Sequence, residues 1–388
     1  MRLTRVQCSW LLSLCGVLMT SVLAGPRARE LGLPFDGTPG PLNAITDVAG
    51  VTVGQVTLVD SHDDLHQVRT GVTAVVPRGA LSTDLPVFAG TFALNGNGEM
   101  TGTAWVEESG FLEGPVLITN THSVGVVRDA AVAWRVSQRA ADATGYFWSL
   151  PVVAETWDGY LNDVNGFHVT AAHVFEALEG AHAGPVEEGN VGGGTGMICH
   201  EFKCGTGSAS RRVSVGDATY TVGVLVQANY GIRDTLRIAG VPIGQHLRDH
   251  RVFTDATLTS HDLGSIIIVV ATDAPLLPHQ LKRVARRAGL GIARNGSFSG
   301  NGSGDLFIAF STANAEGARD QVLNPAQFLG NDALDPVFQG TVEAVEEAVI
   351  NSMVAATEMH GQQGHYAIAL SHPELQALLK RYNRLALP

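Results

Sequence analysis

The segment 265–271 is almost entirely apolar and constrains the fold more than any other part of this sequence. After an initial serine it continues Ile-Ile-Ile-Val-Val-Ala, which is rich in the β-branched residues that favour strands. A strand with one face in water would alternate apolar and polar residues, and this segment does not. It therefore predicts a strand that is covered on both faces, inside a structure of several layers.

Other segments predict a mixed α/β architecture around this strand. Further apolar runs of strand length are bounded mainly by Gly, Asn or Asp, and they occupy residues 51–58, 71–76, 115–119, 220–228 and 305–312. Helical periodicity predicts helices from Pro278 to Ala288, over 337–359 and over 163–178. Because no repeat and no Pro- or Ser-rich linker divides the chain, we expect one large α/β domain with its sheets sandwiched by helices.

The N-terminus, residues 1–24, has the layout of a secretory signal peptide. Arg2 and Arg5 precede an apolar stretch, and Val22-Leu23-Ala24 offers a cleavage site with short side chains. A membrane anchor is the alternative, but the apolar stretch is shorter than the roughly 20 residues that a spanning helix needs. We therefore expect an exported protein, periplasmic or extracellular, with no membrane association after the signal is removed.

Charge and cysteine content disfavour several classes of function. The formal net charge of −12 argues against a nucleic-acid partner, because a polyanion would be repelled on average. Outside the signal segment the chain has two cysteines, Cys199 and Cys204, with His200 between them. Two thiols and one histidine make a poor zinc site, so a local disulfide or two free thiols remain the alternatives.

The glycine-rich segment 192–196 lacks the spacing of a nucleotide-binding loop. We expect neither a metal nor another cofactor.

No familiar hydrolase motif is present, but polar residues stand at the ends of three predicted strands. These segments are 262–265, 300–305 and 227–231. Polar side chains at a shared sheet edge are typical of active sites in α/β folds. The same Gly, Asn, Ser and Asp residues are also typical of ordinary turns. From the residues alone, both interpretations stay open.

Several long stretches resemble one known family. The family comprises L-aminopeptidases that also act as D-amidases and D-esterases, and it includes the β-peptidyl aminopeptidases. The similar stretches run from Asn43 to Asn314 and cover residues 43–58, 70–79, 94–130, 151–170, 189–197, 221–233, 264–294 and 296–314. The resemblance implies a four-layer αββα sandwich like that of N-terminal-nucleophile hydrolases, with a different topology.

The resemblance also implies that the precursor cuts itself once, between Gly264 and Ser265. The products would be an α chain, 25–264, and a β chain, 265–388, that associate and assemble into a homotetramer of αβ units. Glycine permits backbone angles that other residues avoid, so the bond before Ser265 can be held under strain. Cleavage frees the α-amine of Ser265, which can act as a base near neutral pH. This would explain the lack of a histidine triad.

Further site residues follow from the same resemblance. Ser303 and Asp305 would lie beside the nucleophile Ser265, with Asp305 at a position where some relatives carry Glu. Asn229 would donate its amide to the oxyanion, and Tyr160 would bind the oxyanion or the leaving group. An aminopeptidase must also bind the substrate ammonium, for which a carboxylate is a suitable partner. We expect Glu155 or Asp158 to take this role.

The resemblance therefore implies a self-activated serine aminopeptidase that acts on short peptides, amides or esters. A self-processing acyltransferase of similar fold is an alternative enzyme, although that family cuts before threonine. A secreted glycine-rich binding protein without catalytic activity is an alternative of another class. It predicts a single uncut chain instead of two fragments.

Overall fold

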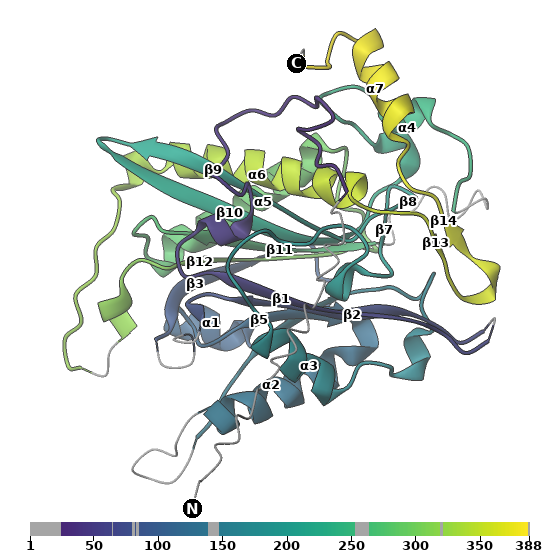
Figure 1. Cartoon of the computed structure of the whole chain (residues 1–388). Helices are drawn as coiled ribbons and strands as arrows, with labels where there is room; N and C mark the ends of the chain where they lie inside the picture. The colour runs from purple at the N-terminus through teal and green to yellow at the C-terminus, as the bar shows by residue number, and fades with distance from the viewer. Residues whose placement is uncertain are drawn as a thin grey trace, which may run out of the picture.

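The computed structural model describes residues 25–386 except 64, 80, 81, 83, 84, 139–146, 253–263, 319 and 320. The expected signal segment, 1–24, lies outside the described residues. Two β-sheets lie face to face with helices on both outer sides, as Figure 1 shows. The predicted αββα sandwich is therefore confirmed.

The larger sheet contains the predicted apolar strand near its centre. Its strand order is β4-β3-β12-β11-β10-β9. β11 pairs with β12 in parallel and with β10 in the antiparallel sense. The strands are β3 (Val87–Ala93), β4 (Phe111–Leu112), β9 (Thr206–Val215), β10 (Ala218–Asn229), β11 (Ser265–Thr272) and β12 (Gly304–Ser311).

The smaller sheet has the order β1-β2-β5-β6 and lies against the inner face of the larger one. Its strands are β1 (Thr52–Ser61), β2 (Gln67–Val76), β5 (Val116–Asn120) and β6 (Val152–Thr156). Two short hairpins complete the β-structure: β7 (Ile198–Cys199) with β8 (Phe202–Lys203), and β13 (Met359–His360) with β14 (Tyr366–Ala367).

Helices cover the outer face of each sheet. α5 and α6 pack on the larger sheet, and α2 and α3 pack on the smaller one (Figure 1). The helices are α1 (Thr103–Ser109), α2 (Val124–Gln138), α3 (Ala171–Glu179), α4 (Ile243–His246), α5 (Pro278–Arg294), α6 (Asp335–Val354) and α7 (His372–Arg381). Within the part of the chain that the structure describes, no helix has the length and apolar character needed to cross a membrane.

The core explains why 265–271 carries no polar face. Ile266, Ile268 and Val270 point into the cluster beneath α5 and α6. Their neighbours Ile267, Val269 and Ala271 point into the cluster between the two sheets. Each face of β11 is thus buried against a different layer, which requires an apolar residue at every position.

All three predicted helices differ in extent from those observed. The helix expected to end at Ala288 continues to Arg294. The helix expected over 337–359 begins at Asp335 and ends at Val354. The helix expected over 163–178 is helical only from Ala171 to Glu179. Its first part forms a short 3-10 turn, and Phe167 then adopts a left-handed conformation with φ 52°. The Asp163 carboxylate bonds His168 across this turn, which favours the turn over a continuous helix.

Candidate active site

Ser265 lies where three strands of the larger sheet meet. It is the first residue of β11, it is 5% exposed, and it pairs with Asn229 at the end of β10. On its other side it pairs with Gly304, the first residue of β12. Neighbouring strands are about 4.8 Å apart, so these three residues stand side by side. The described residues of the three polar segments, 262–265, 300–305 and 227–231, therefore include neighbours that meet at one end of the larger sheet.

The residue before Ser265 is tightly enclosed. A Cβ atom at Gly264 would lie 2.0 Å from the Asn229 carbonyl oxygen and 2.4 Å from Tyr230 Cα, so only glycine fits. The Gly264 carbonyl accepts a hydrogen bond from the Gly304 N–H at 3.2 Å. A main-chain donor thus polarises the carbonyl carbon that precedes the serine. Asp262 and Leu263 lie outside the described residues.

Ser303 and Asp305 form a buried hydrogen-bonded pair on either side of Gly304. The Ser303 hydroxyl donates to Asp305 Oδ1 at 2.6 Å, and both residues are fully buried. Asn95 secures the aspartate twice: Nδ2 donates to Asp305 Oδ2 at 3.2 Å, and Oδ1 accepts from the Asp305 N–H at 2.6 Å. Asp305, which is shorter than the Glu of some relatives, therefore still reaches the Ser303 hydroxyl.

The side-chain amide of Asn229 has a fixed orientation. Its Oδ1 accepts from the Ile198 N–H at 2.9 Å, and its Nδ2 donates to the Trp157 carbonyl oxygen at 2.8 Å. An amide nitrogen carries two hydrogens, so one remains available beyond the bond to Trp157. Asn229 is 4% exposed and is paired with Ser265, which makes it a suitable donor to a negatively charged oxygen at the serine.

Glu155 ends up close to the start of β12. It lies in β6, and its carboxylate accepts from the Glu99 N–H at 3.0 Å and from the Thr121 hydroxyl. A Cβ at the adjacent Gly98 would lie 3.2 Å from both Glu155 Oε1 and Gly304 Cα. Burial raises the pKa of Glu155, although the hydrogen bond from Thr121 opposes the rise. The carboxylate is thus placed beside the strand that flanks Ser265.

Asp158 occupies a different and more enclosed position. It is 1% exposed, and its Oδ1 accepts from the Asn162 amide at 3.1 Å. Its own carbonyl oxygen accepts from the N–H groups of Leu161 and Asn162, which closes a turn. Burial raises the pKa of Asp158 to about 7, and the side chains of Thr70 and Asn162 oppose the rise. Of the two candidate partners of the substrate ammonium, Glu155 thus lies beside β12, whereas Asp158 lies inside a turn.

Tyr160 lies half-buried next to the short hairpins. Its ring stacks on His365 with centroids 4.3 Å apart, and it packs against the cluster of Leu161, Ile198 and Ala367. Burial raises the pKa of Tyr160, and a backbone hydrogen bond from Tyr366 opposes the rise. Since Ile198 also bonds Asn229, Tyr160 is joined to the site through that residue.

Some elements of the site were not singled out from the sequence. Asn95 is one of several polar residues in the turn 94–100, and composition alone does not distinguish it from its neighbours. The N–H of Ile198 and the carbonyl of Trp157 belong to the main chain and leave no signature in a sequence.

Cys199 and Cys204 are joined in a disulfide, which decides between a local disulfide and two free thiols for this pair. Among the described residues, no group of three or more His, Cys, Asp and Glu side chains could hold a metal ion.

The fold and sequence closely match those of characterised peptidases. The structure of the L-aminopeptidase D-Ala-esterase/amidase from Ochrobactrum anthropi, a serine aminopeptidase with a variant of the Ntn hydrolase fold, superposes with a TM-score of 0.87. It is 51% identical, and the match covers 93% of this chain and all of that chain. A β-aminopeptidase from Burkholderia sp. gives a TM-score of 0.84 at 47% identity, covering 94% of this chain and all of that chain.

A curated relative is also an aminopeptidase. The β-peptidyl aminopeptidase BapA of Sphingosinicella microcystinivorans is 51% identical over 390 residues, covering 96% of this chain and 97% of the relative. The fold and these similarities define a serine-type peptidase with an N-terminal-nucleophile hydrolase fold. More particularly, the model of peptidase family S58 matches residues 43–367, and the chain belongs to that family.

Proposed function

We propose that this protein is a self-activated aminopeptidase whose nucleophile is the N-terminal Ser265 of a β chain, 265–388. The observation that carries the proposal is the position of Ser265 at the first residue of β11, between Asn229 and Gly304. The close fit around Gly264 supports cleavage at this bond, because it holds the carbonyl beside the serine. Membership of a serine peptidase family agrees with this chemistry.

Self-cleavage would begin with attack of Ser265 Oγ on the Gly264 carbonyl carbon. The Gly304 N–H, which already bonds that carbonyl oxygen, would stabilise the charge that develops on it. The C–N bond then breaks, the serine nitrogen takes up a proton, and Gly264 is left as an ester on Ser265. Water hydrolyses the ester, which releases the Gly264 carboxylate and restores the serine hydroxyl.

The same groups would then act on substrate. The free α-amine of Ser265 removes the hydroxyl proton as Oγ attacks the substrate carbonyl, and it returns the proton to the leaving amine. Ser303 and Asp305 would hold this amine and serine in place through their buried hydrogen bond. The second hydrogen of Asn229 Nδ2 would bind the oxyanion, and the Tyr160 hydroxyl would bind the oxyanion or the leaving group.

Of the two carboxylates, we favour Glu155 as the partner of the substrate ammonium. Its carboxylate borders Gly98, which in turn borders Gly304 at the nucleophile. Asp158 is bonded to Asn162 inside a turn and has the character of a structural group. An ammonium held by Glu155 would align the first residue of a peptide with Ser265, which gives exopeptidase rather than endopeptidase activity.

The names of the relatives suggest the substrate class. Two of them are described as acting on β-peptides or as β-aminopeptidases, and we propose that N-terminal β-amino acid residues are among the substrates. The test is release of 4-nitroaniline from the 4-nitroanilides of β-alanine and L-alanine and from the N-acetylated forms of both compounds. We expect hydrolysis only of anilides with a free amine. Equal hydrolysis of the acetylated forms would contradict an aminopeptidase.

The two fragments would stay together after cleavage. β11 and β12 of the β chain lie between β10 and β3 of the α chain, so the fragments share one continuous sheet. Glu347 of α6 also pairs with Arg29 and Arg211 of the α chain.

We further propose export through the segment 1–24 and assembly into a tetramer. Val322, Leu323 and Phe328 support assembly, because these apolar side chains are exposed on the segment that projects between β12 and α6 (Figure 1).

A further inference from the structure

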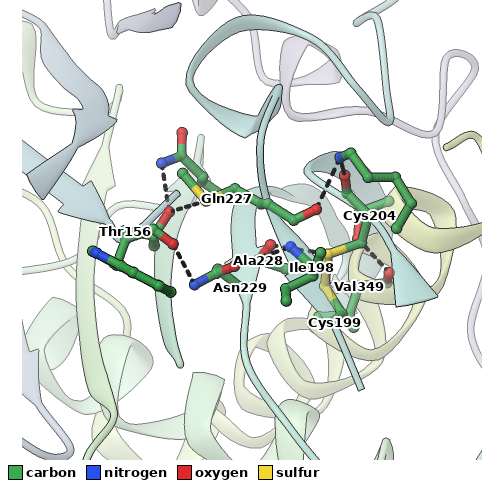
Figure 2. The surroundings of a disulfide bond; sticks show 12 residues. Thr156, Ile198, Cys199, Cys204, Gln227, Ala228, Asn229 and Val349 are labelled. Carbon is green, nitrogen blue, oxygen red and sulfur yellow. Dashed lines mark hydrogen bonds between the residues drawn. A yellow bond between two sulfur atoms is a disulfide. The ribbon is translucent and has the colours of Figure 1, made fainter. Parts of the chain in front are cut away.

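The disulfide closes a compact hairpin next to the proposed site. We call residues 197–205 the disulfide hairpin; it contains β7, β8 and the Cys199–Cys204 bond, and both cysteines are fully buried. Figure 2 shows it beside Asn229 and the end of β10. Its two turn residues, His200 and Glu201, have positive φ angles of 46° and 63°. Non-glycine residues adopt this conformation at a cost, so the surroundings must hold the turn in place.

Two buried basic side chains, Lys203 and Arg233, hold the hairpin through hydrogen bonds to its carbonyl oxygens. Lys203 Nζ donates to the carbonyl oxygens of Met197 and Cys204, which closes the base of the hairpin. Because it is fully enclosed, burial lowers the pKa of Lys203 well below its ordinary value. Arg233 holds the turn itself: Nε donates to the His200 carbonyl at 2.8 Å, and a terminal nitrogen donates to the Glu201 carbonyl at 2.6 Å.

The hairpin contacts three consecutive residues around the end of β10. The Ala228 N–H donates to the Gly205 carbonyl at 3.0 Å, and the His200 N–H donates to the Tyr230 carbonyl at 2.8 Å. Cys204 Sγ also lies 3.1 Å from the Ala228 carbonyl oxygen. Between these anchors, the Ile198 N–H donates to Asn229 Oδ1 at 2.9 Å. Asn229 is therefore held by its main-chain neighbours and by its side chain at the same time.

This contact decides which way the Asn229 amide points. If the amide were turned over, its NH₂ group would face the Ile198 N–H, and two donors would oppose each other. With Oδ1 bonded to the Ile198 N–H of the hairpin, Nδ2 must point the other way, toward the Trp157 carbonyl oxygen. We propose that the disulfide hairpin is a positioning element for the Asn229 amide, with the Cys199–Cys204 bond as its covalent tie. The proposal rests on the oxyanion role given to Asn229 above.

Loss of the disulfide should therefore lower kcat without abolishing the fold. The hairpin would lose its tie across a turn of unfavourable backbone angles, and the Ile198 N–H would no longer be held at Asn229. Small errors in the position of a catalytic donor cost about 10-fold to 100-fold in rate. The cores between the sheets and beneath α5 and α6 contain many other buried contacts and should persist.

A double-mutant cycle on kcat tests the proposal. The variants are Cys199→Ser/Cys204→Ser, Asn229→Ala and their combination, each assayed with an alanyl anilide and normalised to the amount of processed chain on a denaturing gel. We expect the cysteine variant to lose about ten-fold or more in kcat with little change in KM. In the Asn229→Ala background, the same cysteine substitutions should cause almost no further loss.

A matched control separates positioning from general stability. Val127→Ala truncates a fully buried side chain of α2, on the outer face of the smaller sheet, and should lower Tm while leaving kcat near that of the wild type. If the cysteine variant fails to fold, wild-type enzyme made in a reducing cytoplasm and kept in a phosphine reductant replaces it, because it carries two free thiols instead of the disulfide. Its kcat should be low and should recover when air oxidation restores the disulfide.

The outcomes distinguish this inference from the proposed function. An unchanged kcat in the cysteine variant or in the reduced enzyme, or an equal loss with and without Asn229, would overturn the role of the hairpin alone. A wild-type kcat in Asn229→Ala would overturn the oxyanion role of Asn229 and the hairpin proposal with it. A loss that disappears in the Asn229→Ala background supports both.

Discussion

The Ser303 hydroxyl donates to Asp305 Oδ1 at 2.6 Å, and the two residues flank Gly304, which pairs with Ser265 on the neighbouring strand. This pair is fully buried and is secured by Asn95. A buried carboxylate on the strand next to the proposed nucleophile can hold the proton that moves during catalysis. It is therefore the part of the site whose removal should most affect the chemical step after Ser265 itself.

Asp305→Asn should lower kcat about 10²-fold to 10⁴-fold and change KM little, because the lost group acts on proton transfer rather than on substrate binding. Ser303→Ala should cause a similar loss, and the double variant should be only slightly worse than either single one. Steady-state kinetics on processed enzyme provide the measurement. Asp273→Asn is the control, since Asp273 follows β11 at the opposite end and should be dispensable for kcat. Strictly additive losses would argue against a functional pair.

Glu155→Gln should raise KM for a peptide anilide about 10-fold to 100-fold, because a charge-assisted hydrogen bond to the substrate ammonium is lost. For an analogous ester without the amino group, the same substitution should change KM little. Comparison of the two substrates with wild-type, Glu155→Gln and Asp158→Asn enzymes provides the measurement. If Asp158→Asn shows the substrate-dependent effect and Glu155→Gln does not, the assignment must be reversed.

Asp158 should make the stability of the protein depend on pH between about 4 and about 7. Burial raises its pKa from 3.8 to about 7, so the folded protein retains a proton that the unfolded chain has already lost. Stability should therefore decrease as the pH rises through this range, and the decrease should be complete above about pH 7. In Asp158→Asn this contribution disappears. Thermal unfolding of the two proteins from pH 4 to pH 8 tests this, and parallel Tm profiles would contradict it.

Gly264→Ala should block or strongly slow processing, because its Cβ would overlap the Asn229 carbonyl oxygen and displace the carbonyl that Ser265 attacks. Pulse-chase analysis of the precursor on a denaturing gel measures the rate. Gly125→Ala is a suitable control, because a Cβ there meets no atom within 4 Å and the residue lies in helix α2. Processing of Gly264→Ala at the wild-type rate would show that the close packing of Gly264 against the Asn229 carbonyl is irrelevant to cleavage.

Apolar patterning predicted an α/β fold with sheets covered by helices, and the family resemblance supplied the four-layer arrangement. The strands β10, β11 and β12 were recognisable because both of their faces are buried, and α5 because its apolar residues recur at helical spacing. β9 was not predicted, since its Ser and Arg residues resemble those of a loop. Ser208, Ser210 and Arg211 are nevertheless buried, because the Ser208 hydroxyl accepts from the Ile45 N–H, Ser210 bonds Asp47, and Arg211 pairs with Glu347. Such long-range partners have no local signal.

The site could be predicted only in part for the same reason. Ser265, Asn229 and Asp305 were singled out because polar residues at the ends of apolar strands are conspicuous, and the family resemblance suggested their roles. The bonds that fix them come from distant segments: Asn95 reaches Asp305 from the end of β3, and Ile198 reaches Asn229 from the disulfide hairpin. The spacing of Cys199 and Cys204 left their pairing open, and the tight turn between them brings their Cα atoms to 5.6 Å.

The central claim is that Ser265 becomes an N-terminal nucleophile by cleavage of its own chain. Denaturing gel electrophoresis with N-terminal sequencing tests it directly on wild-type, Ser265→Ala and Ser311→Ala proteins. Ser311 is a buried serine at the other end of the same sheet and serves as the matched control. We predict two fragments for the wild type and Ser311→Ala, the smaller beginning Ser-Ile-Ile-Ile, and one uncut, inactive chain for Ser265→Ala. A single active wild-type chain, or an uncut Ser265→Ala chain with wild-type activity, would contradict the account.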